Sequence, residues 1–175
     1  MLKTKKKRWK DGYSHISRSE YASKIIKKYK PQTLLDVGAG NMDLKKFLPI
    51  EIGYTPADLY KRNENTIVFD LNKKQFTNKK FDFISAIGLI EYLNDPIWFL
   101  NKCYLHSKIL LFTYNIYKNN FLLNFLKKKN RKKLGYFNHY NLDEILKLLN
   151  NSSYKKYIHL KKNNKFTEDW FICFK

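Results

Sequence analysis

The chain has 175 residues, of which 43% are hydrophobic and 17% aromatic, and 35 lysines and arginines against 15 acidic residues give it a net charge of +20. This length and apolar content predict one folded domain and exclude a disordered chain. No apolar run approaches the roughly 20 residues that cross a bilayer, and the basic start is not followed by the apolar stretch of a secretory signal, so we expect a cytoplasmic protein without a membrane span.

The first predicted elements are a basic arm, residues 1–16, and a helix that opens a single domain, residues 17–175. Ser17 and Glu20 match a capping box, in which each side chain bonds the backbone N–H of the other residue. Apolar residues then recur at helical spacing. Pro31 is expected to end the helix, because proline disfavours helical backbone in the residue before it.

Five short apolar strands are predicted next, with helices between them. The fourth strand is apolar almost throughout, as expected of a strand buried on both faces. One short helix is expected at 43–48, and another after Asn94 or Asp95, since Pro96 suits a first helical position. The strand ranges are Thr33–Val37, 51–56 with an end near Asp58, 66–69 with an end at Asp70, Phe81–Ala86 and Ser107–Tyr114.

The rest of the chain is predicted to form two helices and a closing hairpin. Asn141 and Glu144 repeat the capping signature before the second helix. The alternation of strands and helices predicts an α/β fold: a doubly wound, mostly parallel seven-stranded sheet with helices on both faces and a C-terminal antiparallel hairpin. The ranges are a helix at 119–129, a lysine-rich turn at 130–133, a helix at 142–149, strands at 154–161 and 168–175, and a connection at 162–167.

The strongest chemical signal is the segment Asp36-Val37-Gly38-Ala39-Gly40, at the end of the first strand. Two glycines there let the backbone turn sharply and approach a ligand. The third glycine of a dinucleotide fingerprint is replaced by Asp43, and the lysine and hydroxyl of a P-loop are missing. The segment therefore indicates a nucleoside site without phosphate-binding apparatus.

Two further carboxylates follow neighbouring strands. Asp58 lies eighteen residues beyond Gly40, where a carboxylate can accept both hydroxyls of a ribose, and Asp70 ends the third strand, within reach of an adenine amine. The carboxyl ends of parallel strands form the ligand crevice of an open α/β sheet. A glycine turn with three carboxylates fits a cationic nucleoside better than a pyrophosphate.

These residues resemble the motifs of the class I S-adenosylmethionine-dependent methyltransferases. The likeness extends over roughly residues 17–175 and includes Phe81-Asp82-Phe83-Ile84 and the stretch 88–96, Gly-Leu-Ile-Glu-Tyr-Leu-Asn-Asp-Pro, which follow the family's fourth-strand pattern. The family's sheet also ends in an antiparallel hairpin. The resemblance implies that the chain is a methyltransferase and that S-adenosylmethionine is its cofactor.

The resemblance also assigns roles to individual residues. The turn of Gly38, Ala39 and Gly40 would hold the methionine part of the donor, and Asp36 would bond toward its amino group. The remaining donor contacts would be Asp58 and Leu59 at the ribose, Asp70 and Leu71 at the adenine, and Ile87 and Gly88 beneath the sulfonium. No metal site is expected, because Cys103 and Cys173 have neither metal-ligand nor redox spacing.

His139 is the candidate general base, since it precedes a helix in the region that commonly builds the family's acceptor pocket. A loop histidine bonded to a helix end is the alternative for this residue. Glu91 and Tyr92 follow the fourth strand, where packing or helix capping accounts for both. Tyr13 and Arg18 are candidates to close over the donor from the N-terminal side.

The acceptor is expected to be a small molecule or a glycan methylated on oxygen, because the signatures of amide and cytosine methylation are missing. An RNA methyltransferase, with phosphates bound by the basic arm and by residues 127–133 and 155–165, is one alternative. A non-catalytic binding module that keeps the fold is another. The charge has its own alternatives: a chain-wide bias toward lysine, a nucleic-acid surface, or an anionic small substrate or lipid.

Overall fold

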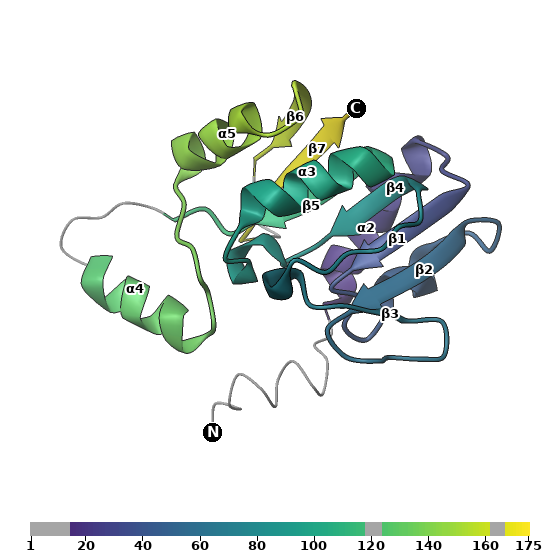
Figure 1. The fold of residues 1–175 in the computed structure, drawn as a ribbon, viewed down its shortest axis with the longest axis horizontal. Coiled ribbons are helices and arrows are strands. Elements are labelled where there is room, and N and C mark those ends of the chain that lie inside the picture. The colour runs from purple at the N-terminus through teal and green to yellow at the C-terminus, as the bar shows by residue number, and fades with distance from the viewer. Residues whose placement is uncertain (1–14, 118–123, 162–166) are drawn as a thin grey trace.

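The computed structural model describes residues 15–117, 124–161 and 167–175 (Figure 1). Seven strands form one sheet in the order β3-β2-β1-β4-β5-β7-β6. The first five strands in this order are parallel to one another, whereas β7 runs antiparallel to both β5 and β6. The strands are β1 (Thr33–Val37), β2 (Gly53–Asp58), β3 (Ile67–Val68), β4 (Phe81–Ala86), β5 (Ser107–Tyr114), β6 (Lys156–Leu160) and β7 (Asp169–Phe174).

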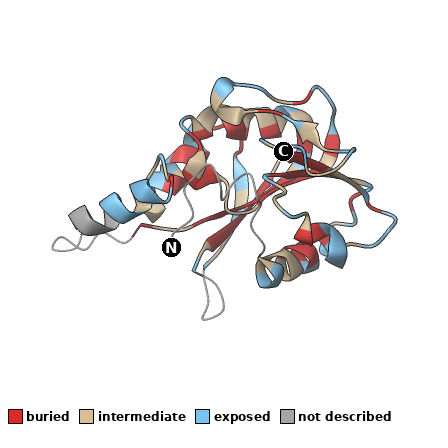
Figure 2. Ribbon diagram, turned by 90° about the horizontal axis from the view of Figure 1, so that it is seen from below, coloured by how far each residue is buried: buried red, intermediate tan, exposed pale blue. Residues whose placement is uncertain are grey.

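The sheet separates two hydrophobic cores, because consecutive strand residues point to opposite faces. On β1, Leu34 packs in the core beneath helix α2 (Ile16–Lys28), and Leu35 packs in the core beneath α3 (Pro96–His106) and α5 (Leu142–Asn151). Buried residues follow the strands and the inward helix faces (Figure 2). The α/β fold, the mostly parallel seven-stranded sheet and the helices on both faces are thus confirmed.

Two of the predicted helix starts are confirmed. Asp95 caps α3 by accepting a hydrogen bond from the Trp98 N–H (3.0 Å), with Pro96 at the first helical position. Asn141 and Glu144 form the expected capping box at α5, with reciprocal bonds of 2.9 and 2.7 Å. Both caps satisfy N–H groups that have no partner within the helix.

The capping box expected at Ser17 and Glu20 is wrong. Helix α2 begins at Ile16, and its N-cap is His15, which makes no side-chain cap bond. The His15 backbone N–H donates to Asp43 Oδ2 (3.2 Å), so a contact with a distant loop sets the start of this helix. Glu20 instead pairs with Lys24 one turn along the helix.

Several other boundaries differ from the sequence prediction. The third strand contains only two residues, and the helix expected at 43–48 is a 3₁₀ helix, η1 (Asp43–Phe47). Residues 130–133 belong to helix α4 (Asn124–Lys133), because the chain offers no glycine or proline to end it before Gly135. Residues 1–14, 119–123 and 162–166 of the expected arm, helix and connection lie outside the described residues.

No helix in the described parts of the chain has both the length and the apolar character required to cross a membrane.

Candidate functional site

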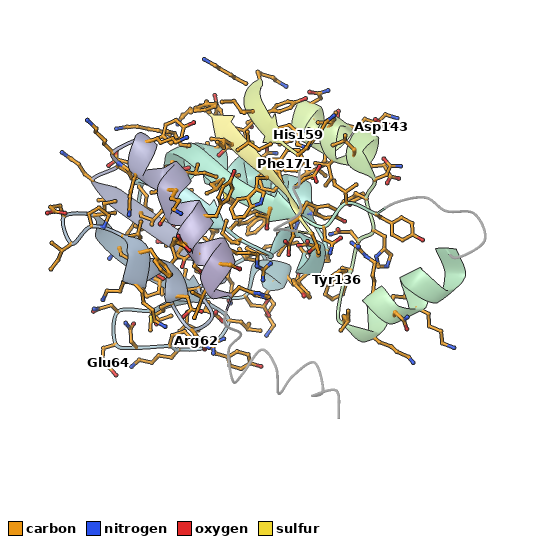
Figure 3. All side chains as sticks on the ribbon, turned by 180° about the vertical axis from the view of Figure 1, so that it is seen from behind. Arg62, Glu64, Tyr136, Asp143, His159 and Phe171 are labelled. Carbon is orange, nitrogen blue, oxygen red and sulfur yellow. The ribbon has the colours of Figure 1, made fainter. Side chains whose placement is uncertain are left out.

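A cavity of about 390 Å³ lies at the carboxyl ends of the parallel strands, in the size range of small-molecule sites. Residues that follow β1 to β5 contribute to its wall, together with Glu168, which precedes β7. Figure 3 shows Arg62 and Tyr136, two wall residues far apart in the chain, both below His159 in that view. Parallel strands thus bring these distant segments together.

Most of the residues expected to hold the donor line this cavity. The exceptions are Asp36 and Ala39, and the candidate base His139 is not part of the wall either. The expected residues in the wall are Gly38, Gly40, Asp58, Leu59, Asp70, Leu71, Ile87 and Gly88.

The glycine turn is fixed by the neighbouring strand. The backbone N–H groups of Gly38 and Ala39 both donate to the carbonyl oxygen of Ala57, at 2.8 and 3.1 Å. Gly38 has a φ of +77°, and a Cβ there would lie 3.2 Å from Leu89 Cδ1. Only glycine takes this backbone conformation without strain, and its missing side chain keeps the cavity open.

Asp58 is the centre of a hydrogen-bond network at the end of β2. Its Oδ2 accepts from the Gly40 N–H (2.9 Å), and its Oδ1 accepts from the Tyr60 N–H (3.1 Å) and from Arg62 Nη2 (3.0 Å). A carboxylate has about four lone-pair sites, so one remains for a ligand hydroxyl. The Arg62 guanidinium is carried on a long flexible side chain. If it moves away from Oδ1, a second lone-pair site of Asp58 becomes free for the ligand.

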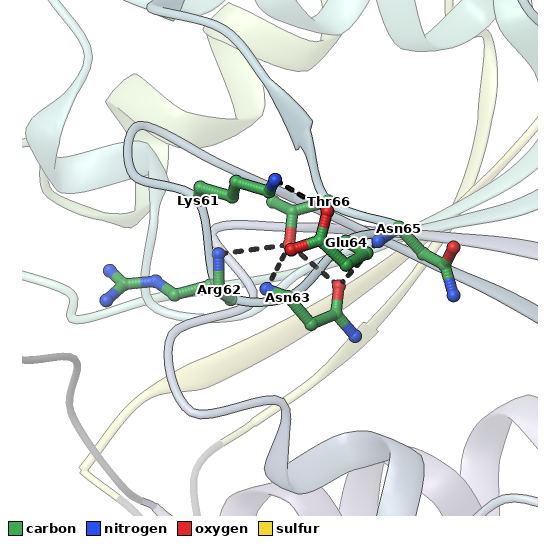
Figure 4. A network of polar contacts seen from close by, with 6 residues as sticks. All are labelled: Lys61, Arg62, Asn63, Glu64, Asn65 and Thr66. Carbon is green, nitrogen blue, oxygen red and sulfur yellow. Dashed lines mark hydrogen bonds and ion pairs between the residues drawn. The ribbon is translucent and has the colours of Figure 1, made fainter.

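The loop that carries Arg62 is ordered by its own polar contacts (Figure 4). The Thr66 hydroxyl accepts from the backbone N–H groups of Arg62 (3.1 Å) and Asn63 (2.9 Å) and donates to Asn63 Oδ1 (3.0 Å). An ion pair between Lys61 and Glu64 (2.8 Å) spans the same loop. These contacts fix the backbone position of Arg62, from which its guanidinium extends to Asp58.

Asp70 ends β3 and caps the 3₁₀ helix η2 (Leu71–Lys73), because its Oδ1 accepts from the Asn72 N–H (3.0 Å). The Asn72 side chain donates to the carbonyl oxygen of Tyr92 (3.0 Å), which ties this segment to the one after β4. Phe69 and Leu93, which are buried, and Leu71 form an apolar wall beside Asp70. This combination suits a planar base with an exocyclic amine.

Asp36 lies inside the sheet, beneath the glycine turn. It is 5% exposed and accepts hydrogen bonds from the hydroxyls of Ser85 (2.6 Å) and Tyr54 (2.7 Å) on the neighbouring strands. Burial raises the pKa of its carboxyl group above the ordinary value. The observed hydrogen bonds of Asp36 therefore join β1 to β2 and β4. A contact between Asp36 and the donor's amino group stays a prediction.

Replacement of Asp36 by Asn is expected to change how stability depends on pH. The folded protein holds the Asp36 proton more tightly than the unfolded chain does, so the free energy of unfolding falls as pH rises from about 4 to the higher folded pKa. Asp36→Asn cannot titrate and should gain stability relative to wild type across that window. Urea unfolding at several pH values measures the difference, and a difference independent of pH would contradict this account.

Gly88 follows β4 and lines the cavity. Its φ is +65°, and a Cβ there would lie 2.9 Å from Arg18 Nη1. Arg18, on α2, forms an ion pair of 2.8 Å with Glu168, and the two side chains are only 12% and 13% exposed. Helix α2 and the residue that precedes β7 are thus joined by an ion pair next to the Gly88 turn.

Glu91 is the most enclosed carboxylate of the cavity wall, at 2% exposed. Its Oε1 accepts from the Asn115 N–H at the end of β5 (2.7 Å). Burial raises the pKa of this carboxyl group, and the nearby charge of Arg131 opposes that rise. Its neighbour Tyr92 packs edge-on against Tyr136, with ring centroids 5.0 Å apart.

His139 lies behind this wall. Its Nδ1 accepts from Arg131 Nε (3.1 Å), and Arg131 also donates to the carbonyl oxygen of Asn115 (3.0 Å) while its guanidinium stacks 4.6 Å from the Tyr136 ring centroid. These contacts connect the end of α4 to the cavity wall. A role for His139 as the general base stays a prediction, and its observed contacts are those of a positioning residue.

Several wall residues had no role in the sequence analysis. Asn115 could have been found, because it directly follows β5 and so falls at the carboxyl edge of the sheet. Glu168 directly precedes β7. Its place in the cavity wall could be predicted only from the antiparallel direction of β7, because the start of that strand then lies beside the carboxyl ends of the parallel strands. Arg62 carries no signal in the sequence, because its position depends on the fold of one loop.

No protein-family model matches the chain, and no curated protein sequence matches it. Solved structures are similar to it in fold. The chain superposes on an assigned O-methyltransferase from Nostoc punctiforme with a TM-score of 0.72 at 10% identity, covering 91% of this chain and 56% of that one. Here the chain spans little more than half the length of its relative.

Two other solved structures are matched over most of their length. An S-adenosylmethionine-dependent methyltransferase from Thermotoga maritima gives a TM-score of 0.60 at 14% identity, covering 91% of this chain and 90% of that one. The plantazolicin methyltransferase BpumL, solved with a monoazolic desmethylPZN analogue and S-adenosylhomocysteine, gives a TM-score of 0.64 at 14% identity, covering 91% of this chain and 82% of that one. At these identities the likeness establishes the fold.

Proposed function

We propose that this chain, which has the fold of the class I S-adenosylmethionine-dependent methyltransferases, binds S-adenosylmethionine and methylates an oxygen of a small molecule or glycan. The observation that carries the proposal is the charge of the cavity. Four carboxylates, two arginines and no lysine occur among its described wall residues, in a chain of net charge +20. An acidic cavity in so basic a protein favours a cationic ligand, and a sulfonium donor is one.

The wall residues fit the parts of this donor. Asp58 would accept the ribose hydroxyls, and the apolar wall beside Asp70 would enclose the adenine. The Gly38–Gly40 turn would face the methionine part, whose carboxylate suits the guanidinium of Arg18. Gly88, which has no side chain, lets the Arg18 guanidinium approach the turn after β4 closely.

The bound donor supplies a methyl group that is electrophilic because its sulfur is positively charged. The protein's contribution is to align that group with the acceptor oxygen and to exclude water, which lowers the barrier of a displacement reaction. The buried wall residues Phe69, Glu91 and Leu93 provide such an enclosed site. A hydroxyl acceptor also requires a group that takes its proton.

Binding of S-adenosylhomocysteine, with NAD as the control ligand, tests the donor site. A ligand at 100 times its dissociation constant stabilises the folded state by about 2.7 kcal/mol. For a domain of this size we expect the melting temperature to rise by about 5–10 °C with S-adenosylhomocysteine and to stay unchanged with NAD. Folded protein that responds to neither ligand would refute the donor site and favour a non-catalytic binding module.

RNA methylation is a second candidate, because of the composition of α4. This helix has no acidic residue in its first turn, ends in Arg131, Lys132 and Lys133, and is joined to the cavity wall through Arg131. An RNA enzyme would retain short single-stranded RNA with an affinity that falls steeply as salt rises. Absence of RNA retention at low salt would exclude this candidate and leave a small-molecule or glycan acceptor.

A further inference from the structure

One of the two carboxylate oxygens of Glu91 accepts no hydrogen bond from another residue in the described structure. Glu91 belongs to the 3₁₀ helix η3 (Ile90–Tyr92), and only its Oε1 is bonded, to the Asn115 N–H. Its Oε2 is shielded from solvent and accepts no hydrogen bond from another described residue, and the other N–H that acts on this carboxylate is the backbone N–H of Glu91 itself. A buried carboxylate oxygen without a hydrogen bond is destabilising, and Glu91 is the only carboxylate among the described residues with a buried oxygen in this state.

The Arg131 guanidinium does not bond this oxygen. Arg131 influences the ionisation of Glu91. Its guanidinium, however, donates to His139 Nδ1 and to the carbonyl oxygen of Asn115, and its plane lies over the ring of Tyr136. The unbonded oxygen therefore belongs to a residue of the cavity wall, and a hydrogen-bond donor that displaces the side chains shielding it can bind it.

The wall around Glu91 indicates what kind of donor can enter. Tyr92 and Tyr136 meet edge to face, and Leu89 adds an aliphatic surface next to Gly88. Aromatic walls favour a flat ring over a flexible polar chain. A carboxylate oxygen at one end of such a wall suits a ring that bears a hydroxyl group.

We propose that the methyl acceptor is a phenol-like aromatic hydroxyl compound and that Glu91 Oε2 accepts its hydroxyl proton. The inference rests on the methyltransferase function proposed above. In the step, the acceptor oxygen forms a bond to the donor's methyl carbon, and the carbon–sulfur bond breaks with its electron pair going to sulfur. The hydroxyl proton moves to Glu91, which later releases it to water.

The Asn115 N–H is the positioning contact in this arrangement. It holds Oε1 at 2.7 Å and thereby fixes the orientation of the carboxylate, so that Oε2 alone is left for the acceptor. His139 does not take part in the proton transfer in this account. It orients Arg131, whose stacking on Tyr136 holds the aromatic wall.

Binding of 4-nitrophenol and 4-nitroanisole to the protein saturated with S-adenosylhomocysteine tests the inference. The probes differ at one position, where 4-nitroanisole has a methyl group instead of the hydroxyl proton, and both this assay and the turnover assay are run at a pH below the pKa of 4-nitrophenol, so that the phenol keeps its proton. Wild-type protein should bind 4-nitrophenol about tenfold or more tightly, the usual effect of a hydrogen bond to a charged group. Glu91→Gln, which keeps an oxygen for the Asn115 N–H, should lose most of this preference and retain its affinity for S-adenosylhomocysteine.

Formation of 4-nitroanisole from 4-nitrophenol and S-adenosylmethionine tests the proton transfer. Glu91→Gln should slow this reaction by about a hundredfold or more, the usual contribution of a general base. Glu51→Gln is the matched control, because Glu51 is exposed and precedes β2, at the opposite edge of the sheet. It should behave as wild type in both assays.

Three results would overturn the inference: a wild-type protein without preference for the phenol, a Glu91→Gln variant that keeps the preference, or wild-type protein that binds 4-nitrophenol and does not methylate it. Failure of the donor site is a separate result. It would appear as absence of S-adenosylhomocysteine binding by the wild type, whatever the response to the phenol.

Discussion

The Gly38→Val variant is expected to lose measurable binding of S-adenosylhomocysteine. Gly38 has a φ of +77°, where a β-branched residue is strained, and even the first side-chain atom would approach Leu89 at 3.2 Å. The remaining valine atoms would enter the space proposed for the methionine part of the donor. Isothermal titration calorimetry at a temperature where the variant is folded measures the loss.

A destabilised glycine variant elsewhere separates this steric effect from general damage. Gly53→Ala is suitable, because a Cβ there would lie 3.3 Å from the Gln32 carbonyl oxygen, at the edge of the sheet away from the cavity. It should lower the melting temperature and leave donor affinity intact. If Gly38→Val bound S-adenosylhomocysteine as the wild type does, the glycine turn would not be part of the donor site.

The Asp58→Ala variant is expected to bind S-adenosylhomocysteine more weakly by about 1–3 kcal/mol, the usual cost of losing a charged hydrogen-bond partner. Asp58 is the only carboxylate that contacts both the glycine turn and the loop after β2 among the described residues, so ribose contacts and local order are lost together. Titration calorimetry at constant salt measures the change in dissociation constant.

Asp143→Ala provides the control for Asp58→Ala. Asp143 is exposed on the first turn of α5, far from the Arg62 edge in Figure 3, so its removal changes the net charge equally without touching the cavity. Its donor affinity should equal that of the wild type. An Asp58→Ala variant with unchanged affinity would mean that the ribose lies elsewhere.

Local patterns predicted the parts of the fold that are decided locally. The bounds of β4 and β5 agree with the prediction, because both strands are apolar runs between clear turn or helix signals. The Asn141–Glu144 cap was predictable for the same reason, since both partners lie within four residues of each other. Asp58 and Asp70 could be placed at the cavity because strand ends converge in any parallel sheet.

Contacts between distant segments could not be predicted from such patterns. The start of α2 depends on a bond from His15 to Asp43, and the burial of Asp36 depends on Tyr54 reaching it from β2. β3 is short because it lies at the edge of the sheet, where Val68 is 52% exposed and apolar residues do not extend the pairing. The unbonded oxygen of Glu91 is visible only once the positions of Asn115 and Arg131 are known.

The ion pair between Arg18 and Glu168 joins residues that are 150 positions apart in the chain. Contacts of such long sequence separation form late in folding, because closing a long loop costs entropy before the contact returns any stability. The carboxyl ends of β1 and β4 can meet early, but the cavity acquires this side of its wall only when β7 has inserted between β5 and β6. Competence to bind the donor should therefore appear during refolding no earlier than the pairing of β7 with β5.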